Sequence, residues 1–315
     1  MRNGSASERA SLGRSAAIAS IATALLLVGL KLWAVWQSNS MALLGSLADS
    51  ALDLVASLVT LFGVIVAARP ADRTHRFGHG KAEALAAIFQ VMLIALSAAG
   101  IAMRSGEALI AGQRVAGPQE GIVVSVIAIV ATFALLGYQR FVIARTRSLA
   151  ISADHVHYQS DLLLNLAVIV ALVLDSYVGL AWADPLFGLA IAAWLLWGAW
   201  RAGGDAVDHL MDREWPEERR SQFVEIAARH PELARLHDLR TRTSGGVDFV
   251  QFHVDLDAEM SVAEAHDILE RVEDELHREF PDMEILIHVD PAGHVDEPGN
   301  MLVEQDEFAK LESKP

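Results

Sequence analysis

Six long stretches in the first 201 residues are almost entirely apolar. Their approximate limits are 16–36, 43–67, 83–110, 119–144, 157–179 and 185–201. About 20 helical residues cross a hydrocarbon core of about 30 Å, so the pattern predicts six transmembrane helices. The last stretch is short and needs tilt or an extension beyond Arg201. A soluble helical bundle is the alternative, but six such stretches leave almost no polar face for water.

Beyond about residue 213 the pattern changes to that of a small water-soluble domain. Residues 216–230 and 261–280 have the character of amphipathic helices, and residues 236–243, 247–256 and 284–289 read as strands. Ser261 followed by Glu264 forms a capping box at the start of the second helix. The order α-β-β-α-β predicts a two-layer domain with the helices on one face of the sheet.

These patterns together predict an α-helical membrane protein with a C-terminal α+β cytoplasmic domain. We expect a cytoplasmic N-terminal arm over residues 1–15, a six-helix transmembrane domain over 16–205, a cytoplasmic domain over 206–294 and a disordered tail over 295–315. The tail is polar and contains Pro and Gly, as is typical of mobile termini.

Composition agrees with a membrane protein and narrows the chemistry. Hydrophobic residues make up 53% of the 315 residues, and the mean hydropathy of +0.32 is above the usual range of soluble domains. The sequence contains no Cys, which excludes disulfides, thiolate metal sites and thiol catalysis. Metal chemistry in this chain therefore depends on His, Asp and Glu.

Charge divides the chain into two parts. Residues 1–201 contain 14 Lys and Arg against 11 Asp and Glu, whereas residues 202–315 contain 11 against 29. Ten basic residues fall in the N-terminal arm and in the loops after the second and fourth apolar stretches, and two, Arg104 and Arg114, fall on the opposite side. Basic residues favour the cytoplasmic side, so both termini are predicted to be cytoplasmic. No nucleic-acid partner is expected.

Two apolar stretches carry ionisable residues at one-turn spacing. Asp49 and Asp53 lie in the second stretch, and His157 and Asp161 open the fifth. Residues four apart share a helix face, and each intramembrane carboxylate costs about 2.5–3.5 kcal/mol on insertion scales, so these four residues indicate a functional site. Three carboxylates and one imidazole suit Zn²⁺ and other first-row divalent ions better than Mg²⁺ or Ca²⁺. A water-filled vestibule that binds no metal is the alternative.

Further candidate ligands lie nearby. Asp154, His155 and Asn165 are candidate ligands or entry-path groups at the fifth stretch. The loop after the second stretch contains one carboxylate and two imidazoles within eight residues, which can close on one metal ion. These loop residues are Asp72, His75 and His79. A solvated polar loop with chance histidines is the competing interpretation.

Histidines are concentrated in the acidic domain. The candidate ligands there are His237, His253, His266, His288 and Asp290. Strands and one helix supply them, and residues 288 and 290 share one strand face. Five such groups can hold two adjacent metal ions with Asp290 as a bridge. Each histidine taken alone is more often an ordinary surface or core residue than a ligand.

These motifs together resemble the cation diffusion facilitator family, and within it the bacterial YiiP-type zinc and ferrous-iron efflux transporters. The matching stretches are SLADSALD at 46–53, FGHGKAE at 77–83, HYQSD at 157–161, HDLRTR at 237–242, HVDP at 288–291 and LMDR at 210–213. The likeness extends from about residue 15 to residue 292 without large gaps.

The resemblance implies a role for each group of residues. Asp49, Asp53, His157 and Asp161 match the family's transport site, Asp72, His75 and His79 its 2–3 loop site, and the five cytoplasmic residues its binuclear site in a metallochaperone-like domain. Lys81 and Asp212 match an ion pair that interlocks the membrane and cytoplasmic parts across a homodimer. A His in the transport site is typical of members that handle Zn²⁺ and Cd²⁺.

The expected function is export of divalent metal cations from the cytoplasm across the bacterial inner membrane. Zn²⁺ is the first candidate, as substrate and as a structural or regulatory ion, with Cd²⁺ or Fe²⁺ as others. Ligands that bind metal when deprotonated and release it when protonated predict exchange for protons by alternating access. The sequence contains no P-loop and no His-Glu-x-x-His motif, so neither ATP hydrolysis nor metalloenzyme activity is expected. A metal-gated channel or metal sensor is the remaining alternative.

Overall fold

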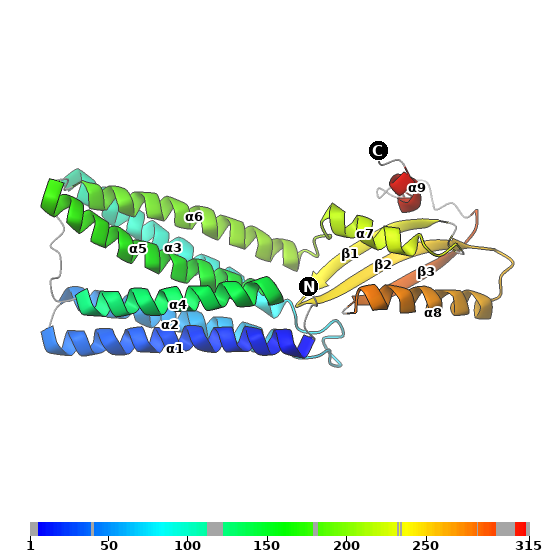
Figure 1. Ribbon diagram of the computed structural model, residues 1–315, viewed down its shortest axis with the longest axis horizontal. Coiled ribbons are helices and arrows are strands. Elements are labelled where there is room, and N and C mark those ends of the chain that lie inside the picture. The colour runs from blue at the N-terminus through cyan, green and yellow to red at the C-terminus, as the bar shows by residue number, and fades with distance from the viewer. Residues whose placement is uncertain are drawn as a thin grey trace. The chain divides into compact units, whose positions relative to one another are not determined.

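The computed structural model of the chain describes residues 6–38, 41–111, 122–178, 182–231, 233, 235–281, 283–293 and 306–312. The chain forms two compact units, Met1–Asp208 and His209–Pro315 (Figure 1). Each unit is considered by itself below.

Among the described residues, the first unit consists of six long helices. They are α1 (Ala6–Ser38), α2 (Met41–Ala67), α3 (Ala82–Ala111), α4 (Ile122–Thr146), α5 (Leu149–Val178) and α6 (Ala183–Leu210). Within the described positions, stretches long and apolar enough to cross a membrane occur in all of these helices except α5. The helical membrane fold is therefore confirmed, and a span by the 30-residue α5 stays a prediction.

The sixth apolar stretch is longer than its sequence pattern indicates. In α6 the apolar span covers Pro185–Leu210, or 26 residues, because the helix continues past Arg201. Gly and Ala follow Arg201, and they do not interrupt the helix. The extension removes the mismatch with the hydrocarbon thickness that a 17-residue stretch would have imposed.

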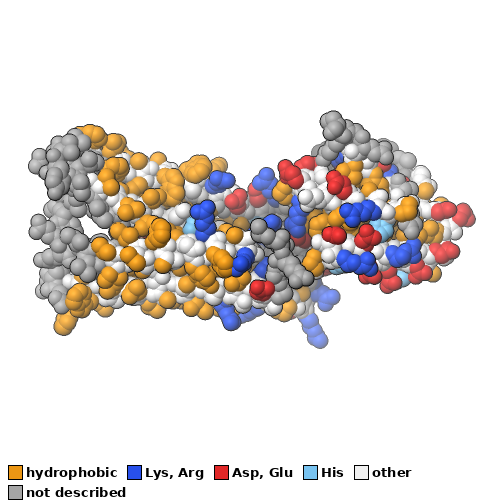
Figure 2. All heavy atoms as spheres, in the orientation of Figure 1, with side chains coloured by type: hydrophobic (Ala, Val, Ile, Leu, Met, Phe, Trp, Pro, Cys, Tyr) orange, Lys and Arg blue, Asp and Glu red, His pale blue; other side chains and the backbone are white. Residues whose placement is uncertain are grey.

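Small residues lie where the helices of the first unit pack, and large apolar side chains face outward. Ala16 and Ala17 of α1 pack with Ala86 of α3 and Ala150 of α5. Trp36 is 78% exposed, and Figure 2 shows hydrophobic side chains covering the visible face of this unit. Lipid tails are as apolar as leucine, so membrane helices associate through close packing rather than by hiding large apolar residues. The exposed apolar surface of the first unit is therefore suited to contact with lipid tails.

Gly63 of α2 lies tightly against α3. A Cβ at this position would collide with the Cβ of Ala86 and lie 3.3 Å from the backbone oxygen of Ala82. We expect Gly63→Ala to lower stability by about 1–3 kcal/mol, because backbone and Cβ atoms cannot move aside as a flexible side chain can. Thermal unfolding of the purified protein in detergent measures this effect.

Gly137 provides the matched control for that substitution. It lies in α4, and an added Cβ there meets no atom within 4 Å. We expect Gly137→Ala to be neutral or to stabilise by up to about 1 kcal/mol, because Ala is the better helix former. Equal melting temperatures for the two variants would show that the close contact of Gly63 with α3 does not determine the stability of the protein.

The second unit has the predicted α-β-β-α-β order. Up to residue 291 its elements are α7 (Glu217–Ala227), β1 (Leu236–Ser244), β2 (Val247–Leu256), α8 (Val262–Glu279) and β3 (Met283–Pro291). The strands form one sheet in the order β1-β2-β3, with β1 antiparallel and β3 parallel to the central β2. The α+β fold expected from the sequence is confirmed.

The core of the second unit lies between one face of the sheet and the two helices. Alternate residues of β2, among them Val250 and Phe252, pack against Phe223 of α7 and against Val272 and Leu276 of α8. The neighbouring positions of β2 point to the other face, where Gln251 is exposed. Polar side chains on that second face are therefore free of the hydrophobic core.

The N-terminus of α8 has the predicted cap. The Oγ of Ser261 accepts a hydrogen bond from the backbone N–H of Glu264, while the Glu264 side chain accepts from the backbone N–H of Ser261. The two hydrogen bonds satisfy donors that a helix start otherwise leaves unpaired. The Ser261 hydroxyl also donates to the Glu264 carboxylate at 2.7 Å, and this bond, together with the one from the Ser261 N–H, holds the pKa of Glu264 below its usual range.

Part of the C-terminal segment departs from the expectation of a disordered tail. Residues 307–312 form a short helix, α9 (Glu307–Glu312). Phe308 and Leu311 pack against the core of the second unit, and Glu307 pairs with Arg220 of α7 at 3.4 Å. Two apolar residues one turn apart thus anchor a segment whose overall composition is polar. Residues 294–305 and 313–315 lie outside the described part of the chain.

Candidate functional site

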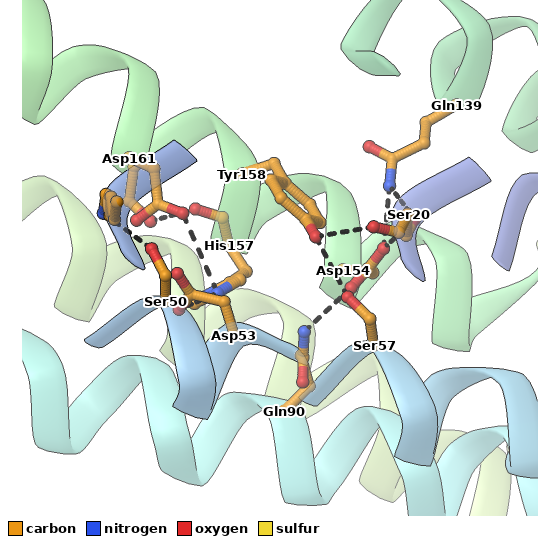
Figure 3. A network of polar contacts seen from close by, with 12 residues as sticks. Ser20, Ser50, Asp53, Ser57, Gln90, Gln139, Asp154, His157, Tyr158 and Asp161 are labelled. Carbon is orange, nitrogen blue, oxygen red and sulfur yellow. Dashed lines mark hydrogen bonds and ion pairs between the residues drawn. The ribbon is translucent and has the colours of Figure 1, made fainter. Parts of the chain in front are cut away.

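Three of the four predicted membrane ligands meet between α2 and α5. The Nε2 atom of His157 lies 2.9 Å from Oδ1 of Asp53 and 3.9 Å from Oδ2 of Asp161. His157 is buried, and the two carboxylates are partly buried. Figure 3 shows the three side chains converging on one point. Asp49 lies in α2, one turn before Asp53, and its side chain is outside the described part of the structure.

The spacing of these atoms fits a metal site. Ligand atoms from all three residues lie within 4.8 Å of one another. Around a tetrahedral Zn²⁺, with bonds of about 2.0–2.2 Å, ligand atoms are roughly 3.3–3.6 Å apart. The observed distances of 2.9 and 3.9 Å bracket that value, so small side-chain shifts would admit an ion.

Asp154 does not join this group but forms a separate buried network one turn away. Its Oδ2 accepts hydrogen bonds from Oγ of Ser20 at 2.6 Å and from Nε2 of Gln139 at 2.8 Å, and its Oδ1 accepts from Nε2 of Gln90 at 3.1 Å. The carboxylate thereby links α5 to α1, α4 and α3 (Figure 3). Because every partner donates, the contacts suit an ionised carboxylate held as a structural joint.

The other two neighbours proposed as candidate ligands lie apart from the metal group as well. His155 faces Gln139, with 3.2 Å between its Nδ1 and the Oε1 of that residue. The Asn165 side chain lies outside the described part of the structure. Sequence spacing alone could not separate Asp154 and His155 from the ligands, because they lie on turns of α5 that adjoin those of His157 and Asp161.

The three predicted ligands of the 2–3 loop also come together. Asp72 Oδ2 lies 3.4 Å from Nε2 of His79, Asp72 Oδ1 lies 3.5 Å from Nδ1 of His75, and the two imidazole ring centres are 4.5 Å apart. Gly78, with φ of 79°, allows the turn that brings His79 back toward Asp72. Asp72 and His75 are exposed on the loop between α2 and α3, and His79 is partly buried.

Local hydrogen bonds preset the Asp72 carboxylate. Its Oδ1 accepts from the backbone N–H of His75 at 2.7 Å and from the hydroxyl and backbone N–H of Thr74 at 2.8 Å each. These donors, led by the His75 N–H, hold the pKa of Asp72 well below its usual range. The carboxylate is therefore ionised at any pH at which a cell lives, as a metal ligand must be.

The third cluster lies on the sheet face that α7 and α8 leave uncovered. Cross-strand register places His237 of β1 opposite His253 of β2, and His253 beside His288 of β3. Oδ2 of Asp290 lies 2.9 Å from Nδ1 of His253 and 3.6 Å from Nε2 of His237. Its other oxygen, Oδ1, lies 3.4 Å from Nε2 of His288. Asp290 thus has one oxygen toward each side, which suits a bridging ligand.

Burial keeps one of these histidines in the form that binds metal. His237 is 3% exposed, and its desolvation, helped by the nearby Arg235 cation, lowers the pKa of its imidazole. A lowered pKa means that the ring is neutral at pH 7, so a ring nitrogen has a lone pair available for a cation. This effect requires the folded sheet and is not visible in the sequence.

His266 is not brought into this cluster. It lies in the first turns of α8, is exposed, and its Nε2 is 3.6 Å from Oε1 of Glu270. The residues of the described metal group are His237, His253 and Asp290, with His288 adjacent. A role for His266 as a ligand stays a prediction.

The sequence interpretation missed two carboxylates beside the cytoplasmic cluster. Asp238 Oδ2 lies 3.7 Å from Nε2 of His253, and Asp255 Oδ1 lies 3.8 Å from Nε2 of His237. Asp238 reaches this position because β1 contains a bulge between His237 and Arg240 and because its own φ is 46°. For Asp238, the available sequence signal was its position directly after the candidate ligand His237.

Lys81 and Asp212 belong to different units, and their predicted ion pair stays a prediction. Within the second unit, Asp212 Oδ1 lies 3.5 Å from Nη1 of Arg242. Asp212 has a φ of 55°, which is unusual for a residue other than glycine and marks the turn after α6.

Comparison with known proteins identifies the family of this chain. A family model of the cation efflux transmembrane domain matches residues 17–211, and a model of the cation efflux protein cytoplasmic domain matches residues 215–292. The chain is 43% identical over 282 residues to the cation-efflux pump FieF of Pectobacterium atrosepticum, which covers 90% of this chain and 94% of that protein. It is 40% identical over 284 residues to FieF of Escherichia coli O127:H6, with 90% and 94% coverage.

Among solved structures, the metal-bound C-terminal domain of the CzcD transporter from Thermotoga maritima is 28% identical. It covers 25% of this chain and 93% of that chain, with a TM-score of 0.24. The two family models match residues 17–211 and 215–292, well over half of the chain. This chain therefore belongs to the cation efflux family, the cation diffusion facilitators, and is a multi-pass membrane transporter that exports metal cations.

Proposed function

We propose that this transporter exchanges cytoplasmic Zn²⁺ for protons through a site formed by Asp49, Asp53, His157 and Asp161, and that it does so as a homodimer by alternating access. The observation that carries the proposal is the position of His157 Nε2, which faces the carboxylates of both Asp53 and Asp161. Cd²⁺ and Fe²⁺ are further substrates that this ligand set can accept.

The proposed exchange depends on whether Nε2 of His157 carries a proton. When His157 Nε2 carries a proton, it donates to Asp53 across the 2.9 Å contact. When it is deprotonated, its lone pair and the two carboxylate oxygens face a common point where a divalent cation can be held. Metal and proton therefore compete for the same electron pairs, and a rise in proton concentration on one side of the membrane favours release there.

Protonation also makes the return of the empty site less costly. Without a cation, the carboxylates of the site would carry uncompensated negative charge inside the membrane. Protons that bind after metal release reduce this charge and let the emptied site reorient. Metal transport and proton movement are then coupled, because reorientation is not favoured for the empty anionic site or for a site that holds both metal and protons.

We assign residues 16–205 to a six-helix membrane domain in the bacterial inner membrane and residues 206–294 to the cytoplasmic domain. The basic loop between α2 and α3 and the basic end of α4 support cytoplasmic termini. The 2–3 loop cluster is then a cytoplasmic metal relay, and Lys81 and Asp212 interlock the two parts in the dimer.

A flux assay on the reconstituted protein tests the proposal. We expect saturable Zn²⁺ uptake into proteoliposomes that accelerates when the lumen is more acidic than the outside and slows when an ionophore collapses the pH gradient. Competition by Cd²⁺, Fe²⁺ and Mn²⁺ ranks the substrates. Non-saturating flux that ignores the pH gradient would identify a pore and contradict the proposal.

The cytoplasmic cluster is proposed to bind two Zn²⁺ ions that allow two acidic domains to approach. We expect His237→Ala and Asp290→Ala each to reduce the number of bound Zn²⁺ ions per protomer and to weaken dimerisation, because cations neutralise part of the repulsion between domains. Metal content by mass spectrometry and dimer dissociation by analytical ultracentrifugation measure both effects.

The His266→Ala variant extends this experiment to the ligand that the structure does not bring into the cluster. Unchanged metal content in that variant would remove His266 from the ligand set. Unchanged metal content and dimerisation in both the His237 and Asp290 variants would contradict the proposed role of the whole cluster.

A further inference from the structure

Lys31 is a basic residue within the apolar part of α1. It lies inside the span Ser7–Trp36, and its Nζ donates a hydrogen bond of 2.6 Å to Oγ of Ser50 in α2. Ser50 is 1% exposed. A lysine near a helix end commonly extends its ammonium outward to the lipid head groups. The Lys31 ammonium instead contacts a buried hydroxyl on the neighbouring helix.

The position of Ser50 brings the Lys31 ammonium close to the proposed transport site. Ser50 follows Asp49 in the chain and precedes Asp53 by three residues, so Ser50 and Asp53 lie on one face of α2. Figure 3 shows the Ser50 side chain beside Asp53, on the side of α2 that faces His157 and Asp161. The Lys31 ammonium is therefore held within about one helical turn of the carboxylates.

Lys31 cannot be a metal ligand, because an ammonium group has three donors and no lone pair. Its effect on a divalent ion is repulsion, and its effect on an empty anionic site is attraction. Both effects act in the same direction: they weaken metal binding relative to the metal-free site. A site of three carboxylates and one imidazole without such a cation would hold Zn²⁺ more tightly and release it more slowly.

We propose that Lys31 is a positioning residue of the transport site whose fixed positive charge sets metal affinity low enough for release. The proposal rests on the proposed function, because it takes Asp53, His157 and Asp161 as the transport ligands. Ser50 holds the ammonium at its place, and the cost of a charge in this part of the membrane is offset by the nearby carboxylates.

Replacement of Lys31 by methionine isolates the charge. Methionine is unbranched, similar in length and well tolerated in apolar helices. Coulomb repulsion between an ammonium and a nearby divalent ion, reduced by water in the access path, predicts a change of about tenfold. We expect K31M to lower the KM for Zn²⁺ about tenfold and to lower the maximal rate, because release becomes slow.

K31R and K31Q complete the set. K31R keeps the positive charge and is expected to retain the wild-type KM, while K31Q, a second neutral variant, should follow K31M and serves if K31M does not fold. Zn²⁺ binding in detergent and flux in proteoliposomes are measured for each, with and without Asp53→Ala. The signal that Asp53→Ala removes defines the transport site apart from the other metal clusters.

The outcomes separate the two proposals. A neutral variant with the wild-type KM, or an arginine variant that behaves like the neutral ones, overturns the role of Lys31. Wild-type binding and flux that Asp53→Ala does not change would overturn the proposed transport site itself.

Discussion

Asp53→Ala is expected to reduce Zn²⁺ flux by at least about a hundredfold, since loss of a ligand costs more than the tenfold to hundredfold effects of residues that only support ligands. Asp53 supplies the shortest contact of the membrane group, 2.9 Å to Nε2 of His157. Without it, His157 and Asp161 remain as ligands on α5, and of the two proposed ligands on α2 only Asp49 is left. Initial rates of Zn²⁺ uptake into proteoliposomes under a fixed pH gradient measure the effect.

The control for this experiment is Asp267→Asn in α8, an exposed carboxylate outside all three metal groups. It should transport at the wild-type rate, which shows that loss of one Asp has no general effect. Asp161→Ala should behave like Asp53→Ala. Normal flux in either of these two variants would mean that the tetrad does not carry the metal.

Asp154→Ala is expected to lower stability by about 3 kcal/mol or more without removing a metal ligand. The substitution removes the shared, charged acceptor of Ser20, Gln90 and Gln139 in the buried interior of the first unit. Ser20 and Gln139 each keep a longer hydrogen bond, to the Ala16 carbonyl at 3.2 Å and to Ser20 Oγ at 3.1 Å. A hydrogen bond to a charged group contributes about 1.5–3 kcal/mol. At about 2–4 °C per kcal/mol for a protein of this size, the melting temperature in detergent should fall by about 10 °C.

Asp154→Asn is the matched variant for that measurement. It retains one acceptor oxygen and the volume of the side chain, but its amide group presents a donor where Asp154 accepts, so an intermediate loss of stability is expected. A melting temperature of the Ala variant within about 2 °C of wild type would show that the network contributes little to stability.

The sequence was sufficient to predict elements whose signals are local. The apolar stretches predicted the helices of the first unit, and the capping box of Ser261 and Glu264 predicted the start of α8 within one residue. Two pairs of ionisable residues with four-residue spacing, one in α2 and one in α5, predicted two helix faces that meet. The three of these residues whose side chains are described do lie together. Each of these signals depends on helical periodicity, which neighbouring residues alone determine.

The tail and the cytoplasmic cluster show where local signals end. The polar composition of the C-terminal segment concealed Phe308 and Leu311, whose contacts exist only because the core of the second unit offers an apolar surface. The histidines of β1, β2 and β3 are aligned by strand register, and the bulge after His237 moves Asp238 toward His253. A shift of register by one residue would have sent these side chains to opposite faces.

The amino-acid sequence by itself determined that this chain lies in a membrane, which residues carry charge there, and that metal binding must use imidazole and carboxylate groups. Hydropathy and residue chemistry are properties of each residue, so they need no folded structure. Only the tertiary structure decided which ionisable residues share a site: His157 meets Asp53, Asp154 instead joins Gln90 and Gln139, and Lys31 reaches Ser50. These pairings depend on how helices distant in sequence are packed and rotated, and that arrangement is set by close contacts such as Gly63 against Ala86.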